Sequence, residues 1–217
     1  MKQRAAVMVG AAILTGLAGC MDLNEDVISG LTPGAYGTEA AFQALVNATY
    51  EPLRSFWAQE RGFTLTEFGT DIYTKGADGS YKFVNDYTTQ LNPTVDYFTN
   101  TWNDFYRAIN TANAALGQAP IVHMDSTLKL KRVAEVRFLR ALYYFYLVQM
   151  FGPLDITLQE VTAPTTEAHR SPVDSVYDVI LDDLTYAEAN LPGVQQDYGR
   201  VTKGAVQHLL ADRKSVV

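Results

Sequence analysis

The sequence predicts an all-α protein with a tetratricopeptide-like helical-repeat scaffold and a long inserted loop region. Apolar residues recur at spacings of three and four over several long stretches, which is typical of amphipathic helices. These stretches stop at paired glycine and proline residues, which end helices. An alternating strand pattern does not compete with them, apart from a short run at 154–158.

The first helix is expected over 38–56, where Thr38 can cap the first turn. Pro52 predicts a kink or an early end of this helix. The helical pattern then breaks over 58–94, which is rich in glycine and carries turn signals at 75–80. A loop of this length is usually functional or disordered, and its many aromatic residues argue against disorder.

Helices are next predicted over 95–118 and 126–151, the second ending at Gly152-Pro153. That helix is apolar over most of its circumference from 138 to 151, so we expect it to be buried centrally. A fourth helix should begin at Ser171-Pro172, with serine as the cap and proline at the first helical position. A fifth should begin at Thr202. The second and third helices, and then the fourth and fifth, are predicted to form two antiparallel pairs.

The N-terminus has the order of a lipoprotein signal peptide. Lys2 and Arg4 precede a mostly apolar run at 5–17, and small residues lead into Cys20, the only cysteine. The run is shorter than the roughly 20 apolar residues that span a bilayer. Residues 17–20 resemble a bacterial lipobox, which implies cleavage before Cys20 and its lipidation; a free cysteine after an ordinary cleavage site is the alternative.

Several acyl chains on Cys20 would hold the protein firmly at a membrane, since each buried methylene contributes about 0.8 kcal/mol. Asp22, Glu25 and Asp26 follow closely and resemble the surface-export signal of Bacteroidetes lipoproteins, although short acidic runs are often only solvated tethers. The expected organisation is a signal peptide at 1–19, a lipidated cysteine and tether at 20–37, and a helical domain at 38–217.

Composition limits the function classes. The chain is 47% apolar and 12% aromatic, which is enough for a packed core. Its net charge of −7 argues against nucleic acid as a partner, because phosphate binding needs clustered Lys and Arg.

Residues 134–145 read AEVRFLRALYYF, and Leu147 and the sequence FGPL at 151–154 follow them. This region strongly resembles the signature helix of the SusD/RagB family of outer-membrane nutrient-binding lipoproteins. Other segments resemble the same family in the same order: Trp102, Tyr106, Ile109, Asn110 and Asn113; Ser171, Tyr177, Ile180, Asp183, Leu184, Ala187, Leu191 and Pro192; and 199–205.

The resemblance covers nearly all of the mature chain and implies a tetratricopeptide-like scaffold with loops inserted on one side. It also implies a non-catalytic lipoprotein on the outer face of the outer membrane. Such a protein acts as a lid on a TonB-dependent, SusC-like barrel and holds oligosaccharides, or sometimes peptides, for import. Family members continue well beyond residue 217, so we expect this chain to be their N-terminal part without the C-terminal half.

The residues themselves offer no strong catalytic motif, metal-ligand spacing or cofactor signature. Glu67 and Asp71 are the best-spaced carboxylate pair for glycoside hydrolysis, but a structural role is expected for them. Asp182 and Asp183 are predicted to lie on a solvated helix face. Three binding functions remain open: glycan capture, which is favoured, peptide capture, and a structural role beside the barrel without ligand contact.

Sugar rings have an apolar face that stacks on aromatic side chains, and the inserted loop is rich in such side chains. The family builds part of its ligand site from this region, so the resemblance implies four candidate ligand-binding residues: Tyr73, Tyr81, Phe83 and Tyr87. For each of them, packing onto the helical core is the alternative. Trp102 and the tyrosines and phenylalanine at 143–146 are expected to be core residues.

Overall fold

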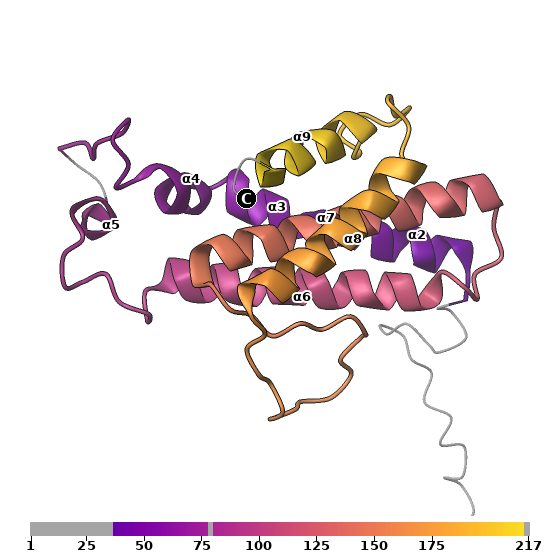
Figure 1. The fold of residues 1–217 in the computed structure, drawn as a ribbon, viewed down its shortest axis with the longest axis horizontal. Coiled ribbons are helices and arrows are strands. Elements are labelled where there is room, and N and C mark those ends of the chain that lie inside the picture. Colours follow the sequence, from indigo (N-terminus) through magenta and orange to yellow (C-terminus); the bar gives the residue numbers. More distant parts are fainter. Residues whose placement is uncertain (1–36, 78–79, 215–217) are drawn as a thin grey trace, which may run out of the picture. The chain divides into compact units, whose positions relative to one another are not determined.

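The structure is a computed structural model that describes residues 37–77 and 80–214 (Figure 1). Within these residues it contains helices and no strand, apart from an isolated antiparallel bridge between Leu154 and Ser171. The prediction of an all-α protein is therefore confirmed. The helices are α2 (Glu39–Ala48), α3 (Glu51–Trp57), α4 (Glu60–Glu67), α5 (Lys82–Asp86), α6 (Asp96–Gln118), α7 (Ser126–Phe151), α8 (Val173–Asn190) and α9 (Lys203–Lys214).

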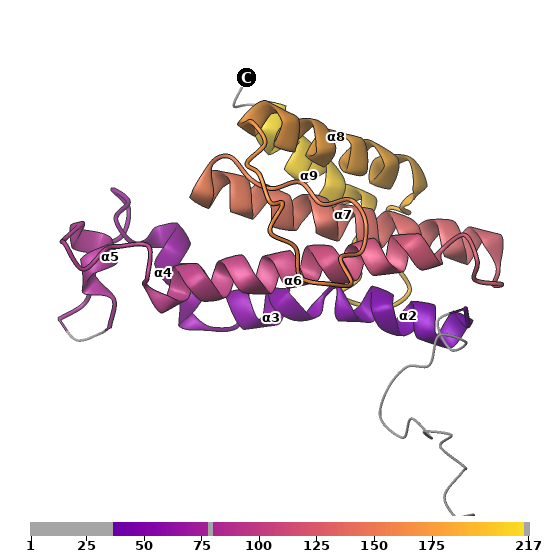
Figure 2. The ribbon, with the colours of Figure 1, turned by 90° about the horizontal axis from the view of Figure 1, so that it is seen from below.

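Helix α7 is the centre of the helical bundle, as its apolar circumference predicts. Figure 2 shows α6 with α2 and α3 on one side of α7, and α8 with α9 on the other. Successive helices from α6 to α9 run back and forth, so the predicted antiparallel pairs are present (Figure 1). Fully buried side chains of α7, among them Leu139, Tyr143 and Leu147, form the middle of the main core. Burying one such side chain contributes about 1.5–3 kcal/mol.

The first predicted helix is in fact two helices. The Thr38 hydroxyl accepts a hydrogen bond from the Ala41 amide at 3.2 Å, so the expected cap is present. The helix breaks at Thr49 and Tyr50, before Pro52 rather than at it. Pro52 lies in the first turn of α3, where its missing N–H loses no hydrogen bond.

Two other expectations are corrected. The segment 58–94 is not wholly a loop, because α4 and α5 lie within it. Ser171 does not cap α8: its amide donates to the Leu154 carbonyl at 2.6 Å, and Pro172 occupies the cap position without a side-chain hydrogen bond. Gly152 ends α7 as predicted, with a positive φ of 71° that favours glycine.

The predicted signal peptide and Cys20 lie outside the described residues, as does all of the predicted tether except Gly37. In 37–77 and 80–214, none of the helices combines the length and the apolar character needed to cross a membrane.

Candidate functional site

An ion pair between α7 and α8 is buried, although its sequence pattern resembles a solvated face. The Arg140 guanidinium donates to both carboxylate oxygens of Asp183, at 2.7 and 2.9 Å, and to the Asn113 side-chain oxygen at 2.8 Å. Asp183 is fully buried, so the expectation of a solvated position was wrong for this residue. Asp182 fits the expectation, with a side chain that is 79% exposed. Asp183 faces inward because α8 packs over α7 there.

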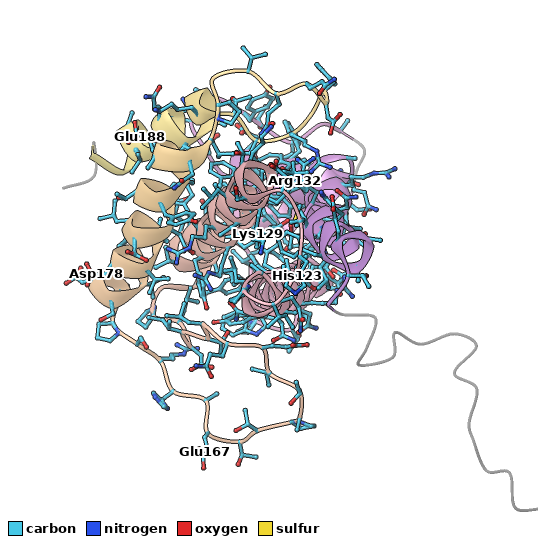
Figure 3. The ribbon with its side chains drawn as sticks, turned by 90° about the vertical axis from the view of Figure 1, so that its right-hand side faces the viewer. His123, Lys129, Arg132, Glu167, Asp178 and Glu188 are labelled. Atoms are coloured by element: carbon cyan, nitrogen blue, oxygen red, sulfur yellow. The ribbon has the colours of Figure 1, made fainter. Side chains whose placement is uncertain are left out.

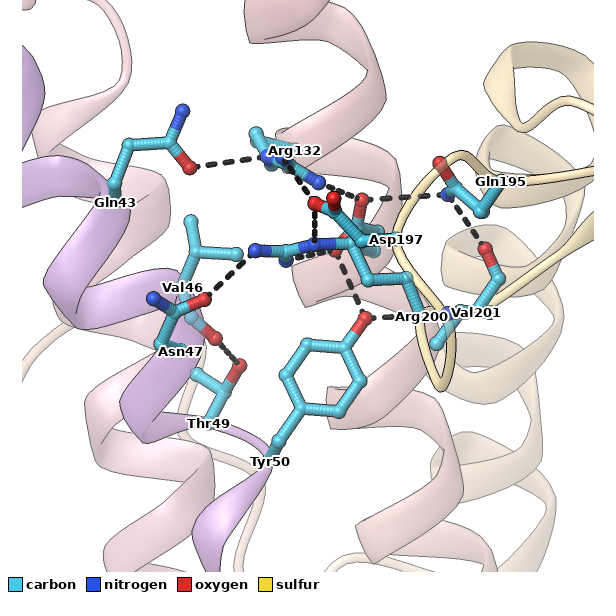
Figure 4. A network of polar contacts seen from close by, with 11 residues as sticks. Gln43, Val46, Asn47, Thr49, Tyr50, Arg132, Gln195, Asp197, Arg200 and Val201 are labelled. Atoms are coloured by element: carbon cyan, nitrogen blue, oxygen red, sulfur yellow. Dashed lines mark hydrogen bonds and ion pairs between the residues drawn. The ribbon is translucent and has the colours of Figure 1, made fainter.

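A second buried network joins α7 to α2, α3 and the segment before α9 (Figure 4). Its centre is Glu135, which is 0% exposed. Glu135 accepts hydrogen bonds from Arg132 at 2.6 Å, Tyr50 at 2.8 Å, Arg200 at 2.9 Å and Gln195 at 3.3 Å. Because a buried charge is tolerated only when it is paired, these contacts fix the three segments to one another.

The network shifts the ionisation of two of its members. Burial, together with the adjacent Glu135 carboxylate, raises the pKa of Tyr50 well above its ordinary value. Burial by itself would lower the pKa of Arg200, but hydrogen bonding to Glu135 outweighs it and raises that pKa. Both shifts favour a neutral Tyr50 phenol and a charged Arg200 guanidinium. In these states both groups can donate hydrogen bonds to Glu135.

These buried charges are paired across the contacts between packed segments and hold those segments together. Most other charged side chains lie outside the bundle: Figure 3 shows Asp178 on α8 and Glu167 on the 152–172 segment pointing away from it, with Arg132 inside. Glu67 is half-buried and Asp71 is exposed. Within the part of the chain that the structure describes, His, Cys, Asp and Glu form no cluster suited to a metal ion.

The four candidate ligand-binding residues lie in the aromatic segment, by which we mean residues 63–77 and 80–98. Tyr73 follows α4 and is 48% exposed. Its ring meets Phe63 edge to face, with centroids 5.1 Å apart. Phe63 is itself 40% exposed, so these two rings present apolar surface to solvent and contribute little to the main core.

Tyr81 and Phe83 form a separate group on and before α5, with centroids 5.7 Å apart. The Tyr81 ring stacks on Tyr97 at 3.8 Å, and its hydroxyl donates to the Asp96 carboxylate at 2.9 Å. Partial burial and this hydrogen bond raise the pKa of Tyr81 to about 12. Tyr81 therefore anchors α5 to the start of α6 and offers less free ring surface than Tyr73.

Tyr87 is the most exposed of the four candidates, at 69%. Its hydroxyl donates to the Gly69 carbonyl at 3.2 Å. Gly69 has φ 79°, and a Cβ added there would lie 2.5 Å from the Tyr87 hydroxyl, so only glycine permits this contact. Tyr81 and Tyr87 also have positive φ, 60° and 52°, a region that bulky residues rarely adopt and that often marks functional segments.

The structure thus brings Tyr81 and Phe83 together, and places Tyr73 beside Phe63 and Tyr87 beside Gly69. Sequence reasoning missed two members of these groups. Phe63 was expected in the loop but lies on α4, and Tyr97 was assigned to a helix, which concealed its stacking on Tyr81. Tyr143, Tyr144 and Phe145 of α7 lie in the core as predicted, whereas Tyr146 and Trp102 are partly buried and pack against it. The Trp102 ring contacts Tyr106 and Phe151.

A family model and several known proteins are similar to this chain in sequence. A family model described as "Starch-binding associating with outer membrane" matches residues 28–212. The chain is 32% identical over 92% of its length to SusD-like protein P2 of Formosa agariphila, and 26% identical over 97% of its length to a SusD-like protein of Bacteroides ovatus. It spans 40% and 39% of those two relatives.

Solved structures of SusD-like proteins are similar to this chain in fold. A laminarin binding SusD-like protein has a TM-score of 0.69 and 29% identity, over 82% of this chain and 40% of that one. A SusD superfamily protein from Parabacteroides distasonis has a TM-score of 0.66 and 29% identity, over 80% of this chain and 38% of that one.

Proposed function

Because this chain belongs to the SusD-like family, we propose that it captures glycans by binding oligosaccharides without turning them over. The observation that carries the proposal is the likeness to a laminarin binding SusD-like protein over 82% of the chain. The family description, which names starch and the outer membrane, supports the same ligand class and location.

The aromatic segment supplies surface suited to such a ligand. Tyr73, Phe63 and Tyr87 leave ring area exposed to solvent on a scaffold whose own core is complete without them. Loops on a rigid scaffold are the usual position of binding residues. A shallow aromatic surface of this kind permits capture and release of a sugar chain, which is the behaviour that import needs.

The proposal extends to the cellular context. The protein is held at the outer membrane by lipid on Cys20, faces the cell exterior and delivers its ligand to a TonB-dependent, SusC-like barrel. Residues 1–19 are then the signal peptide, 20–37 the lipidated cysteine and tether, and 38–217 the helical domain. Mass spectrometry of the mature N-terminus tests the anchor: an unmodified Cys20 or an intact signal peptide would contradict it.

Calorimetric titration with laminari-oligosaccharides tests ligand capture. Replacing Tyr73 and Tyr87 together with alanine should weaken binding by about fivefold per lost ring, which corresponds to about 1 kcal/mol each by analogy with aromatic pairs. Ile72→Ala is the matched control, because Ile72 is adjacent and 75% exposed but not aromatic; it should leave binding unchanged. The proposal fails if the wild-type chain binds neither laminari-, starch- nor xyloglucan-derived oligosaccharides.

A further inference from the structure

An open pocket lies where α2 meets the turn at 197–200, away from the aromatic segment. Its volume is about 340 Å³, which is within the range of about 300–1,000 Å³ typical of small-molecule sites. Its lining residues are Asn47, Tyr50, Asp197, Tyr198, Gly199 and Arg200.

The pocket and the aromatic segment lie near opposite ends of α6. Phe42 and Val46 of α2 pack against Ala112 and Ala115, in the C-terminal half of α6, whereas Tyr81 stacks on Tyr97 at its start. At 1.5 Å per residue, these two positions on the helix are about 25 Å apart. A ligand group in the pocket therefore belongs to a different subsite from one on Tyr73 or Tyr87.

The floor of the pocket is rigid and leaves polar groups unused. Arg200 donates to the Asn47 side-chain oxygen and to one Asp197 carboxylate oxygen, both at 3.0 Å. Because a guanidinium can only donate, the Asn47 amide nitrogen must be the free end of that side chain. Within the described part of the chain, neither this nitrogen nor the second Asp197 oxygen has a hydrogen-bond partner. The pocket thus offers one free donor and one free acceptor, which separate hydroxyl groups of one ligand can use.

The charges around the pocket favour a neutral ligand. Two carboxylates, Glu135 and Asp197, balance two guanidinium groups, Arg132 and Arg200, which are paired with them. Among the described residues around the pocket, these four charges balance, and none of the guanidinium groups is left unpaired to select a phosphate or an acidic peptide. Glu135 is fully buried and fixes Tyr50 and Arg200, so little ordering is needed when a ligand binds.

Tyr198 gives the pocket an aromatic side. Its exposure is 106%, so the ring contributes nothing to the packing of the described structure. The turn continues at Gly199 with φ 88°, a conformation that favours glycine. A pocket that is lined by an exposed aromatic ring, a free donor and a free acceptor matches a sugar ring, which has an apolar face and hydroxyl edges.

We propose that the pocket formed by Asn47, Asp197 and Tyr198 is a second saccharide subsite, in which a neutral pyranose stacks on Tyr198 and hydrogen-bonds to Asn47 and Asp197. This inference rests on the proposed function, since it takes the chain to be a glycan binder. It adds a contact about 25 Å from the aromatic segment along α6, so that one glycan chain can be held at two separate points.

The experiment is a titration of the ¹⁵N-labelled full chain with a short laminari-oligosaccharide, followed by amide chemical shifts. Wild-type protein should show shifts at Asn47 and 197–200 as well as near Tyr73 and Tyr87. Tyr198→Ala should weaken binding at the 197–200 group by fivefold or more and leave the other group unchanged, while Tyr198→Phe should retain both. Val194→Ala is the control, because Val194 is 85% exposed in the same segment and does not line the pocket.

The outcomes separate the two proposals. Shifts near Tyr73 and Tyr87 without any at 197–200, or shifts at 197–200 that persist at full affinity in Tyr198→Ala, overturn the second subsite and leave glycan capture standing. Shifts at 197–200 that survive alanine substitution of Tyr73 and Tyr87 support the second subsite as an independent one. No shifts in either region with any of the oligosaccharides named above overturn both proposals.

Discussion

Tyrosine has opposite roles in α7 and in the aromatic segment. In α7, Tyr143 and Tyr144 are fully buried, and their hydroxyls donate to the backbone carbonyls of Thr49 and Thr157 at 2.5 and 2.9 Å. In the aromatic segment, Tyr73 and Tyr87 expose about half or more of their surface. Tyrosine is a core residue where packed helices enclose its ring, and a surface residue where the chain turns away from the bundle, even though Tyr87 also donates to a carbonyl.

Charged residues show the same contrast. Arg140 and Asp183 lie between packed helices and are paired with each other, whereas Asp182, one position away, points to solvent. A buried charged group between the helices that loses its partner therefore stays unpaired, since water does not reach it. In the aromatic segment, an exposed side chain such as that of Tyr73 can be removed without leaving a buried charged group unpaired. This difference predicts where substitutions destabilise the fold and where they alter only binding.

Among single substitutions, the largest expected effect is at the buried ion pair. Asp183→Ala leaves the Arg140 guanidinium buried without its main partner, so the free energy of unfolding should fall by about 3–5 kcal/mol. Asp182→Ala is the neighbouring control and should change it by less than about 0.5 kcal/mol. Denaturant unfolding measures both; equal effects of the two substitutions would contradict the burial of the Arg140–Asp183 pair.

A smaller effect is expected when one buried hydroxyl is removed. Tyr143→Phe leaves the Thr49 carbonyl without this donor inside the core, which should cost about 1–3 kcal/mol of unfolding free energy. Tyr73→Phe removes a hydroxyl from an exposed ring and should leave stability unchanged within about 0.5 kcal/mol. Thermal unfolding of the two variants side by side is the measurement, and a loss in Tyr73→Phe as large as in Tyr143→Phe would contradict the assignment.

Alkaline pH should destabilise the helical region. Burial raises the pKa of Tyr143 and Tyr144 above the ordinary value of 10.0, so in the folded protein both remain neutral when the unfolded chain begins to ionise. Their contribution is complete below pH 10 and is lost as pH rises above it, by about 1.4 kcal/mol per pH unit for each tyrosine. The free energy of unfolding measured between pH 10 and 12 tests this prediction. Tyr143→Phe should reduce its slope against pH by about 1.4 kcal/mol per pH unit. An unchanged slope would contradict the burial of the Tyr143 hydroxyl.

The smallest expected effect is in the aromatic segment itself. Gly69→Ala places a side chain at a positive φ and against the Tyr87 hydroxyl, so we expect a loss of about 1 kcal/mol and a displaced Tyr87 ring. Gly117→Ala is the matched control, because a Cβ there meets nothing within 4 Å and alanine favours the helix. Tyr87 fluorescence or amide shifts near residue 87 would report the displacement, and an unmoved ring would show that the contact is not close.

Much of the helical region could be predicted because its signals are local. The spacing of apolar residues gave α6 and α7 nearly to the residue, and Gly152-Pro153 gave the end of α7. The break between α2 and α3 was displaced by two or three residues, since proline is accepted in a first turn as readily as it ends a helix. The candidate site was harder to predict from the sequence. The exposure of Tyr73 and the stacking of Tyr81 on Tyr97 depend on residues that are distant along the chain.

The helical class, the order of the long helices and the resemblance to the SusD/RagB family follow from the sequence, because periodicity and short ordered motifs are properties of the chain. Which charges are buried and which tyrosines are exposed depends instead on how the helices pack. Asp182 and Asp183 are adjacent and chemically identical, and only the packing of α8 on α7 separates them. The Glu135 network likewise joins residues from 50 to 200, because partners so distant along the chain meet only once the helices have packed.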